Sequence, residues 1–316
     1  MEPTIYSASA HHIRRENIDP DALFILSKLT RNGYLSYLVG GGVRDLLMGH
    51  IPKDFDIATS ARPEEIKKIF RHCLLIGRRF RLAHVRFGLK VIEVSTFRAG
   101  DTNEENLIIR DNCWGPPEED VLRRDFTLNG LFYSATDDTV IDYVGGYQDL
   151  NKRLLRTIGN PESRFKQDPV RMIRLLKFRA RFGLAVEAAT WNALESCKSE
   201  ITKSSPARVL EELLKMLESG ASLPFFKQMT STGLLAYLFP RLSRHLQQEE
   251  GKEIFKFLET IDLLIKRNKR RKPDRSVLVT ALLFPLIMQR LPELATQDKV
   301  DFGHLANTTH EILEQL

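Results

Sequence analysis

The segment Lys53-Asp54-Phe55-Asp56-Ile57 carries two carboxylates one residue apart. On a strand, alternate side chains point the same way, so Asp54 and Asp56 would share one face, about 6.5 to 7 Å apart. Two carboxylates so placed repel each other unless a cation lies between them. Their hard oxygen atoms suit a Mg²⁺ ion that also holds phosphates. The pair therefore predicts a metal site on Asp54 and Asp56, for Mg²⁺ or alternatively Mn²⁺, with a solvated turn as the competing interpretation.

A glycine turn shortly before these aspartates favours the metal site. Leu38-Val39-Gly40-Gly41-Gly42-Val43-Arg44-Asp45 has the order strand, glycine turn, helix start. Glycines let the backbone come close to a phosphate, and the N–H groups at a helix start favour an anion. Arg44 could add a planar fork of donors. The motif is neither a Walker A loop nor a dinucleotide fingerprint, and taken alone an ordinary tight turn would explain it.

Glu93 offers a third carboxylate, because it interrupts an otherwise apolar strand from Val91 to Phe97. A single glutamate is costly to bury without a partner. It either faces solvent or completes a three-carboxylate site. Such a site could hold two metal ions about 3.5 to 4 Å apart.

The pattern of apolar residues predicts the elements that would position these groups. Up to about residue 150 the chain is mixed, with a helix over 21–31, strands over 35–39, 55–58, 85–87, 90–97 and 140–143, and a long polar loop over 100–117. Beyond that point a 3.6-residue period dominates, with helices opened by Asp168-Pro169 and Ser205-Pro206 and others starting near Glu250 and Ser276. The pattern predicts an α+β fold, with a mixed β-sheet head over 1–150 followed by an all-helical remainder, which we divide into a neck over 151–220 and a body over 221–316.

The turn, the Asp-x-Asp pair and the later acidic residue together resemble the nucleotidyltransferase superfamily. Arg123-Arg124-Asp125-Phe126-Thr127-Leu128-Asn129 matches a motif of the bacterial poly(A) polymerase and class II CCA-adding tRNA nucleotidyltransferase family. Three further segments resemble that family's head–neck hinge, its nucleotide-selecting neck motif and the following neck helix: 143–150, 164–174 and 206–213. These matches follow the family's order over residues 30 to 220.

The resemblance implies a nucleotidyltransferase-type head and a role for each matching residue. Metal and catalysis would fall to Asp54 and Asp56, joined by Glu93 and by Asp125, for which a salt bridge to a neighbouring arginine is the alternative. The nucleotide would be bound by Gly41, Gly42, Arg44, Arg124, Asn129, Asp168, Arg171 and Arg174.

The neck motif departs from the family pattern at one position. Asp168 and Arg171 are three residues apart, so on a helix they share a face and could address one base edge. Gln167 stands where the family has glutamate, and it would hold Arg171 without charge assistance. This leaves base selectivity, but not phosphoryl chemistry, open.

Basic residues indicate where RNA would bind. The stretch over 75–85 is similar to poly(A) polymerases and contains Arg78, Arg79, Arg81 and His84, which suit a triphosphate or primer backbone. A solvated strand edge and a packed histidine are the alternatives. Arg208 on the neck helix is a further candidate, as is the run over 266–272, for which a solvated loop is equally acceptable.

The composition agrees with such a protein without identifying it. The chain has 316 residues, 42% hydrophobic and 28% charged, with a net charge of +6. We expect no secretory signal, and the sequence has no apolar run of about 20 residues and three cysteines at no metal-binding spacing. We expect a monomeric cytoplasmic protein, away from membranes, whose partners are ATP and an RNA 3′ end.

The expected reaction is template-independent adenylate addition with release of pyrophosphate. CCA addition to tRNA and a non-catalytic RNA-binding relative are the alternatives. The intact Asp54 and Asp56 argue against the non-catalytic relative.

Overall fold

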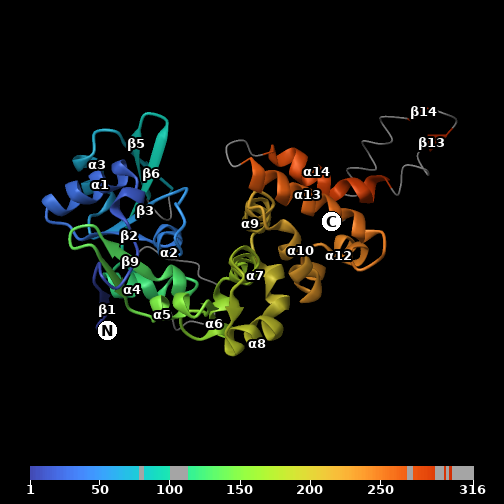
Figure 1. Cartoon of the computed structure of the whole chain (residues 1–316), viewed down its shortest axis with the longest axis horizontal. Helices are drawn as coiled ribbons and strands as arrows, with labels where there is room; N and C mark the ends of the chain where they lie inside the picture. Colours follow the sequence, from blue (N-terminus) through green and yellow to red (C-terminus); the bar gives the residue numbers. More distant parts are fainter. Residues whose placement is uncertain (78–81, 100–112, 269–272, 289–294, 297–298, 301–316) are drawn as a thin grey trace. The chain divides into compact units, whose positions relative to one another are not determined.

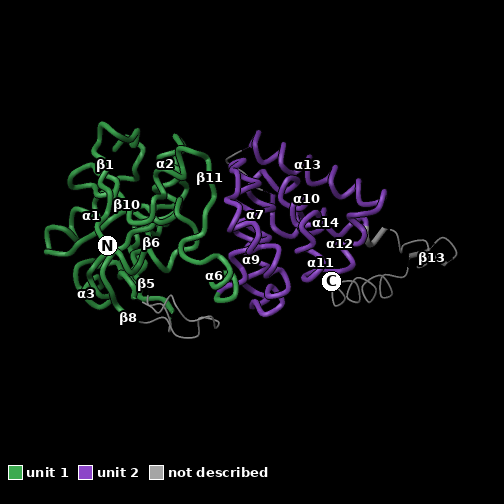
Figure 2. Tube along the Cα trace, turned by 90° about the horizontal axis from the view of Figure 1, so that it is seen from below, with its two compact units in different colours: residues 1–167 green, residues 168–316 purple. Residues whose placement is uncertain are grey.

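The computed structural model describes the whole chain except residues 78–81, 100–112, 269–272, 289–294, 297–298 and 301–316. It divides into two compact units, Met1–Gln167 and Asp168–Leu316 (Figure 2). The segment 151–167, which we predicted to begin the neck, belongs to the first unit. The further division into neck and body at residue 220 stays a prediction.

The first unit is built on an eight-stranded sheet with the order β1-β10-β9-β2-β3-β6-β5-β4 (Figure 1). All neighbours are antiparallel except β3 and β6, which are parallel. In chain order the strands are β1 Thr4–Tyr6, β2 Ser36–Val39, β3 Asp56–Thr59, β4 Cys73–Ile76, β5 Leu82–Phe87, β6 Lys90–Thr96, β9 Leu131–Ser134 and β10 Thr139–Asp142. Outside this sheet, β7 (Arg98–Ala99) pairs with β8 (Cys113–Trp114), and β11 covers Leu154–Leu155.

Six α-helices and two short 3-10 helices complete the described part of the first unit. They are α1 Pro20–Arg31, α2 Gly41–Leu47, α3 Pro63–Ile69, α4 Pro117–Leu122, α5 Gly146–Asn151, α6 Pro161–Gln167, η1 Arg15–Asn17 and η2 Thr127–Asn129. Helix α1 shows why these segments are helical. Asp19 caps it by accepting a hydrogen bond from the Asp21 N–H at 2.9 Å, Pro20 is its first residue, and the buried side chains follow a helical period at Ala22, Ile25, Leu26 and Leu29.

The two faces of the sheet are covered differently. One face carries Ile57 and Val94, both fully buried, on the side where α1 and α3 contact the sheet. The opposite face is covered over its β2–β9 half by an apolar cluster around Phe97, Val121 and Phe132. Its β4–β6 half is exposed, as shown by the side chains at 74, 76 and 91, which are 49%, 39% and 41% exposed. Among the described residues, the sheet therefore has a bare surface beside its buried centre.

The second unit is mainly helical. Its α-helices are α7 Val170–Phe182, α8 Ala188–Cys197, α9 Pro206–Leu217, α10 Ser222–Ser231, α11 Leu234–Leu238, α12 Pro240–Leu246, α13 Gly251–Arg267 and α14 Arg275–Met288, with the 3-10 helix η3 over Lys198–Lys203. Asp262 of α13 joins two of them, since its carboxylate accepts hydrogen bonds from the backbone N–H groups of Ser222 and Leu223 at the start of α10, at 2.8 and 2.9 Å. Three short strands also occur: β12 Ala185–Val186, β13 Ala295–Thr296 and β14 Lys299–Val300.

Most predicted elements are confirmed, with two corrections. The α+β class is right, and the helices expected near 205, 250 and 276 begin at Pro206, Gly251 and Arg275. The loop predicted over 100–117 is wrong where it is described, because Cys113 and Trp114 pair with Ala99 and Arg98 as strands; residues 100–112 lie outside the described part. Asp168 does not cap α7, because the helix begins at Val170 and its N-cap residue is Pro169; one oxygen of the Asp168 carboxylate accepts a hydrogen bond from an arginine.

Two smaller observations concern the whole described chain. All three cysteines, at 73, 113 and 197, are free thiols. Within the described residues no helix combines the length and the apolar character that crossing a membrane requires.

Candidate active site

The predicted glycine turn joins β2 to α2. Gly40 has a φ of +66°, a left-handed conformation that favours glycine. A Cβ on Gly42 would lie 3.4 Å from the backbone oxygen of Asp54. The turn and the Asp-x-Asp segment are therefore in direct contact, and Gly41 and Gly42 lie at the start of α2, as the sequence predicted.

Asp54 and Asp56 lie where the chain enters β3. Asp56 is the first residue of the strand and Asp54 precedes it, so the strand begins one residue later than predicted. Both aspartates are exposed, Phe55 is half-buried and Ile57 is fully buried. This alternation is what the two-faced strand pattern requires, and it leaves both carboxylates open to solvent.

Glu93 lies beside Asp56 in the sheet. The parallel pair Ile57 and Val94 sets the register of β3 and β6, and Asp56 and Glu93 are the residues that precede them on the two strands. On the other side of Glu93, the His84 Nε2 atom is 3.4 Å from a Glu93 carboxylate oxygen. Within the described residues, no three carboxylate, histidine or cysteine side chains gather closely enough to hold one ion. The three-carboxylate site and a phosphate contact by His84 therefore stay predictions.

Arg44 is buried and connects the two sequence motifs of the first unit. Its Nε and Nη2 donate to Oδ1 of Asp45 at 2.9 and 2.7 Å, and its Nη1 donates to Oδ1 of Asn129 at 2.7 Å. The Asn129 Nδ2 donates to Oδ1 of Asp125 at 2.8 Å. Arg44 thus fixes the Asn129 amide, which in turn holds Asp125. A direct contact between Arg44 and a triphosphate stays a prediction.

Arg124 is held by Asp120, by the Asn129 carbonyl and by the ring of Phe132. Its Nη2 donates to Oδ2 of Asp120 at 2.8 Å, its Nη1 donates to the Asn129 carbonyl at 3.3 Å, and its guanidinium lies 5.2 Å from the centre of the Phe132 ring. Asp120 and Arg124 are four residues apart at the end of α4. That opposite-charge spacing was the available signal for the pair.

The neck residues cluster at the start of α7. Oδ2 of Asp168 accepts a hydrogen bond from Nη2 of Arg208 at 2.8 Å, whereas its buried Oδ1 has no hydrogen-bond partner among the described residues. Arg171 is buried. The buried Gln167 accepts a hydrogen bond from Nη1 of Arg164 at 3.0 Å. The prediction that Gln167 also holds Arg171 is not tested by these contacts.

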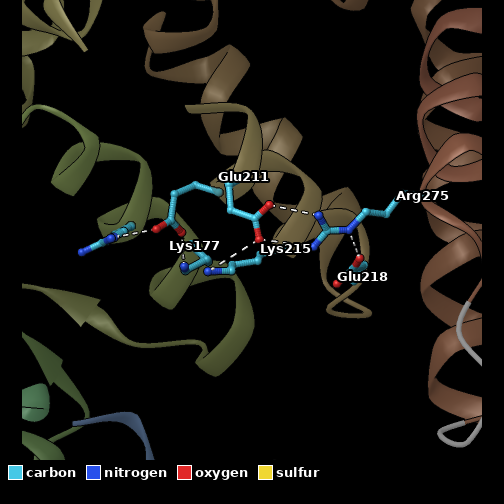
Figure 3. A network of polar contacts seen from close by, with 7 residues as sticks. Lys177, Glu211, Lys215, Glu218 and Arg275 are labelled. Carbon is cyan, nitrogen blue, oxygen red and sulfur yellow. Dashed lines mark hydrogen bonds and ion pairs between the residues drawn. The ribbon is translucent and has the colours of Figure 1, made fainter. Parts of the chain in front are cut away.

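Helix α9 contacts its neighbours through charged pairs (Figure 3). Glu212, which lies within the predicted neck helix over 206–213, is buried and accepts hydrogen bonds from Arg174 at 2.7 Å and from Lys177. Burial raises the pKa of Glu212, but the charges and hydrogen bonds of Lys177 and Arg174 outweigh it, so this pKa lies below its ordinary value. The adjacent Glu211 is half-buried and accepts hydrogen bonds from both Nη atoms of Arg275 on α14, at 3.0 and 3.2 Å. Arg174, a predicted nucleotide-binding residue, therefore also secures α7 to α9.

The remaining basic candidates are only partly described. Arg78, Arg79 and Arg81 lie outside the described residues. Arg208 is 51% exposed at its side chain and is the partner of Asp168. In the run over 266–272, Lys266 and Arg267 end α13 and are exposed, and 269–272 lie outside the described part.

Two family models match this chain. The poly A polymerase head domain covers residues 36–156, and the probable RNA and SrmB-binding site of polymerase A covers residues 183–246. These ranges contain the glycine turn, the Asp-x-Asp pair, the Arg124–Asn129 group and all of α9.

Curated relatives and a solved structure agree with these models. Poly(A) polymerase I of Salmonella typhi is 40% identical over 93% of this chain and 66% of its own length, and that of Escherichia coli is 38% identical over 95% and 67%. A CCA-adding enzyme of Bacillus velezensis is 35% identical over 72% of this chain and 57% of its own length. The Bacillus stearothermophilus CCA-adding enzyme in complex with CTP superimposes with a TM-score of 0.67 at 28% identity, over 87% of this chain and 71% of that one. The chain thus spans about two thirds of the poly(A) polymerases that it matches, and it belongs to the poly(A) polymerase and CCA-adding nucleotidyltransferase family.

Proposed function

We propose that this chain is a cytoplasmic, template-independent nucleotidyltransferase that transfers adenylate from ATP to the 3′ end of RNA. The observation that carries the proposal is the exposed Asp54 and Asp56 pair at the start of β3, in contact with the glycine turn. Family membership supports the reaction class. The exposed position of these two carboxylates beside the glycine turn supports their catalytic role in nucleotidyl transfer.

The two aspartates fit a divalent cation. Both are exposed and both offer hard oxygen donors, which is the ligand type that Mg²⁺ takes from proteins together with phosphate oxygens. Asp54 and Asp56 would hold the ion, and Mn²⁺ is an alternative for the same donor set. When bound, such an ion neutralises charge on the phosphates and lowers the pKa of a coordinated hydroxyl.

The reaction joins an RNA oxygen to phosphorus. The 3′-hydroxyl oxygen of the RNA forms a bond to the α-phosphorus of ATP, the bond from that phosphorus to the bridging oxygen breaks, and pyrophosphate leaves. The chain contributes mainly positioning and charge neutralisation in such a transfer. The N–H groups at the start of α2 face the phosphates, and Arg44 keeps the Asn129 amide and Asp125 in a fixed arrangement.

Asp168 supplies base selection. Its Oδ1 is buried and has no hydrogen-bond partner among the described residues, while Arg208 holds the other oxygen. An acceptor of this kind suits an exocyclic amino group, which adenine and cytosine carry where guanine and uracil have oxygen. This distinction favours ATP and CTP over GTP and UTP, and Arg171 would add a donor.

Adenylate addition is favoured over CCA addition by the similarity along the chain. The two poly(A) polymerases match 93% and 95% of the chain at 40% and 38% identity, against 72% at 35% for the CCA-adding enzyme. CCA addition remains the second candidate, because the two activities share the motifs of the first unit.

One assay separates the candidates. The protein is incubated with Mg²⁺, each NTP separately, and either an oligo(A) primer or a tRNA that lacks its CCA end. We expect long ATP-dependent extension of oligo(A); short CTP-then-ATP addition confined to tRNA would instead establish CCA addition. RNA binding without incorporation would establish the non-catalytic relative.

The same assay tests the aspartates. Asp54→Asn and Asp56→Asn should each lower kcat at least about a thousandfold, since several kcal/mol of charge stabilisation are lost. The matched control is Asp137→Asn, an exposed carboxylate in the turn between β9 and β10. Activity of the two variants equal to that of the control would refute the proposal.

A further inference from the structure

The bare half of the sheet ends in a cavity at its outer strand. The cavity has a volume of about 560 Å³ and is lined by Arg71, His72, Cys73, Leu74, Arg86 and Gly88. The backbone N–H of Arg86 on β5 donates a hydrogen bond to the carbonyl of His72 at 2.9 Å. This bond holds His72, which directly precedes β4, beside β5. Leu74, 49% exposed, adds an apolar surface to the same cavity.

The two arginines that line this cavity have no acidic partner among the described residues. Arg71 and Arg86 are exposed, and within the described residues neither side chain takes part in an ion pair or a hydrogen bond. Lys90, the first residue of β6 after the β5–β6 turn, differs from these two arginines because it forms ion pairs with Asp19 and Asp21. Guanidinium groups remain charged at any physiological pH and form two parallel bonds to phosphate oxygens. Two unpaired guanidiniums around a cavity therefore favour a phosphate group.

The cavity lies on the same sheet face as the predicted metal ligands. Glu93 is opposite His84 across β6 and β5, and Arg86 is two residues beyond His84, so its side chain points to the same face. Asp56 lies next to Glu93 on β3. With strands about 4.8 Å apart and a rise of about 3.3 Å per residue, Arg86 is about 12 Å from Asp56 along this face.

We propose that Arg71 and Arg86, with His72, form a subsite for a backbone phosphodiester of the RNA strand, a few nucleotides before the 3′ end. The inference rests on the proposed function for its choice of RNA. An RNA strand whose 3′ end is at Asp56 can extend across the exposed face of β6 and β5. At the cavity, this face carries the positive charges of Arg71 and Arg86. The Leu74 side chain contacts the sugar or base beside that phosphate.

The test is RNA binding by the double variant Arg71→Ala/Arg86→Ala of the full chain. Affinity for an oligo(A) long enough to reach the cavity should fall about tenfold, and the slope of log K against log salt should fall in magnitude by about 0.7, the value for one lost phosphate contact on a single strand. In steady-state assays the KM for this primer should rise, with kcat and the KM for ATP unchanged. A dinucleotide primer, which is too short to reach the cavity, should be extended equally well by both proteins.

The matched control is Arg14→Ala/Arg31→Ala, which removes the same charge from exposed positions elsewhere in the first unit. Unchanged affinity and salt slope in the cavity variant, or an equal loss in the control, would overturn the subsite. Binding is measured without ATP, so the result does not depend on catalysis. A wild-type chain that binds oligo(A) through the cavity without extending it would refute the proposed function and leave the subsite intact.

Discussion

Nη1 of Arg44 on α2 donates to Oδ1 of Asn129 at 2.7 Å, across 85 positions in the sequence. This bond joins the glycine-turn motif to the Arg124–Asn129 motif. Because Asn129 also holds Asp125, a change at the turn is transmitted to a residue that the sequence assigns to the active centre. The two motifs are therefore one structural group.

Asn129→Ala should destabilise the first unit by about 1–3 kcal/mol, because it removes a buried hydrogen-bond partner of Arg44 and releases Asp125. Urea unfolding measures the change. Asn192→Ala on the exposed face of α8 is the control and should alter stability by less than about 0.5 kcal/mol. Equal urea midpoints for the two variants would show that the Arg44–Asn129–Asp125 hydrogen bonds do not contribute to the free energy of unfolding.

Arg208→Ala should weaken nucleotide discrimination, because Asp168 loses the charged donor that fixes its carboxylate. We expect the ratio of kcat/KM for ATP to that for UTP to fall about tenfold, as for the loss of one charge-assisted hydrogen bond. Steady-state kinetics with all four NTPs check this, and Arg208→Lys should keep part of the discrimination. An increase in the KM for RNA at constant discrimination would instead make Arg208 an RNA-binding residue.

Glu212→Gln and the neighbouring Glu211→Gln should differ in stability. Removing one partner of a buried pair costs about 3–5 kcal/mol, whereas an exposed pair contributes about 0–1 kcal/mol; Glu212 is buried and Glu211 is 43% exposed at its side chain. Thermal unfolding of both variants tests the difference. Similar melting temperatures would contradict the assigned role of Glu212.

The pH dependence of stability should reflect the same residue. The pKa of Glu212 is lower in the folded chain than its ordinary value of 4.5, so below that pH the unfolded chain takes up a proton that the folded chain does not. Stability from this group is complete above about pH 4.5 and is lost as the pH falls through the folded pKa. Glu212→Gln should remove this part of the acid destabilisation, measured as the difference from wild type in urea midpoints over pH 3 to 6.

Gly146→Ala should be far more damaging than Gly145→Ala. A Cβ at Gly146 would lie 2.1 Å from the Thr127 carbonyl oxygen, whereas Gly145 has open space and only a left-handed φ of +79°. The second change should cost about 1 kcal/mol, and the first should prevent the first unit from reaching its native packing. Expression yield and unfolding midpoints of the two variants provide the comparison.

The elements that could be predicted from the sequence are those whose structure follows from local residue patterns. The helix over Pro20–Arg31 follows from its cap, its proline and its apolar period, and β6 follows from β-branched alternation. Strands β4 and β9 were not predicted, because Cys73–Ile76 and Leu131–Ser134 are short apolar runs that do not distinguish strand from helix.

For the candidate site, the residue types were predictable but their partners were not. The motif residues Arg44 and Asn129 were both named, yet nothing local shows that one binds the other. Asp168 has the sequence of a helix cap, but α7 begins two residues later, at Val170, and only the folded chain brings Arg208 close to the Asp168 carboxylate. Contacts between residues far apart in the chain could therefore not be predicted from local patterns.

The carboxylate of Asp142 accepts four backbone hydrogen bonds, from Val144, Gly145 and Gly146 at Oδ1 and from Tyr147 at Oδ2. These contacts span at most five residues, so closing the turn costs little chain entropy. By contrast, the β2–β9 pairing joins segments far apart in the chain and forms slowly. The Asp142 turn can therefore form early in folding and hold the direction of the chain into α5 before the central strands assemble.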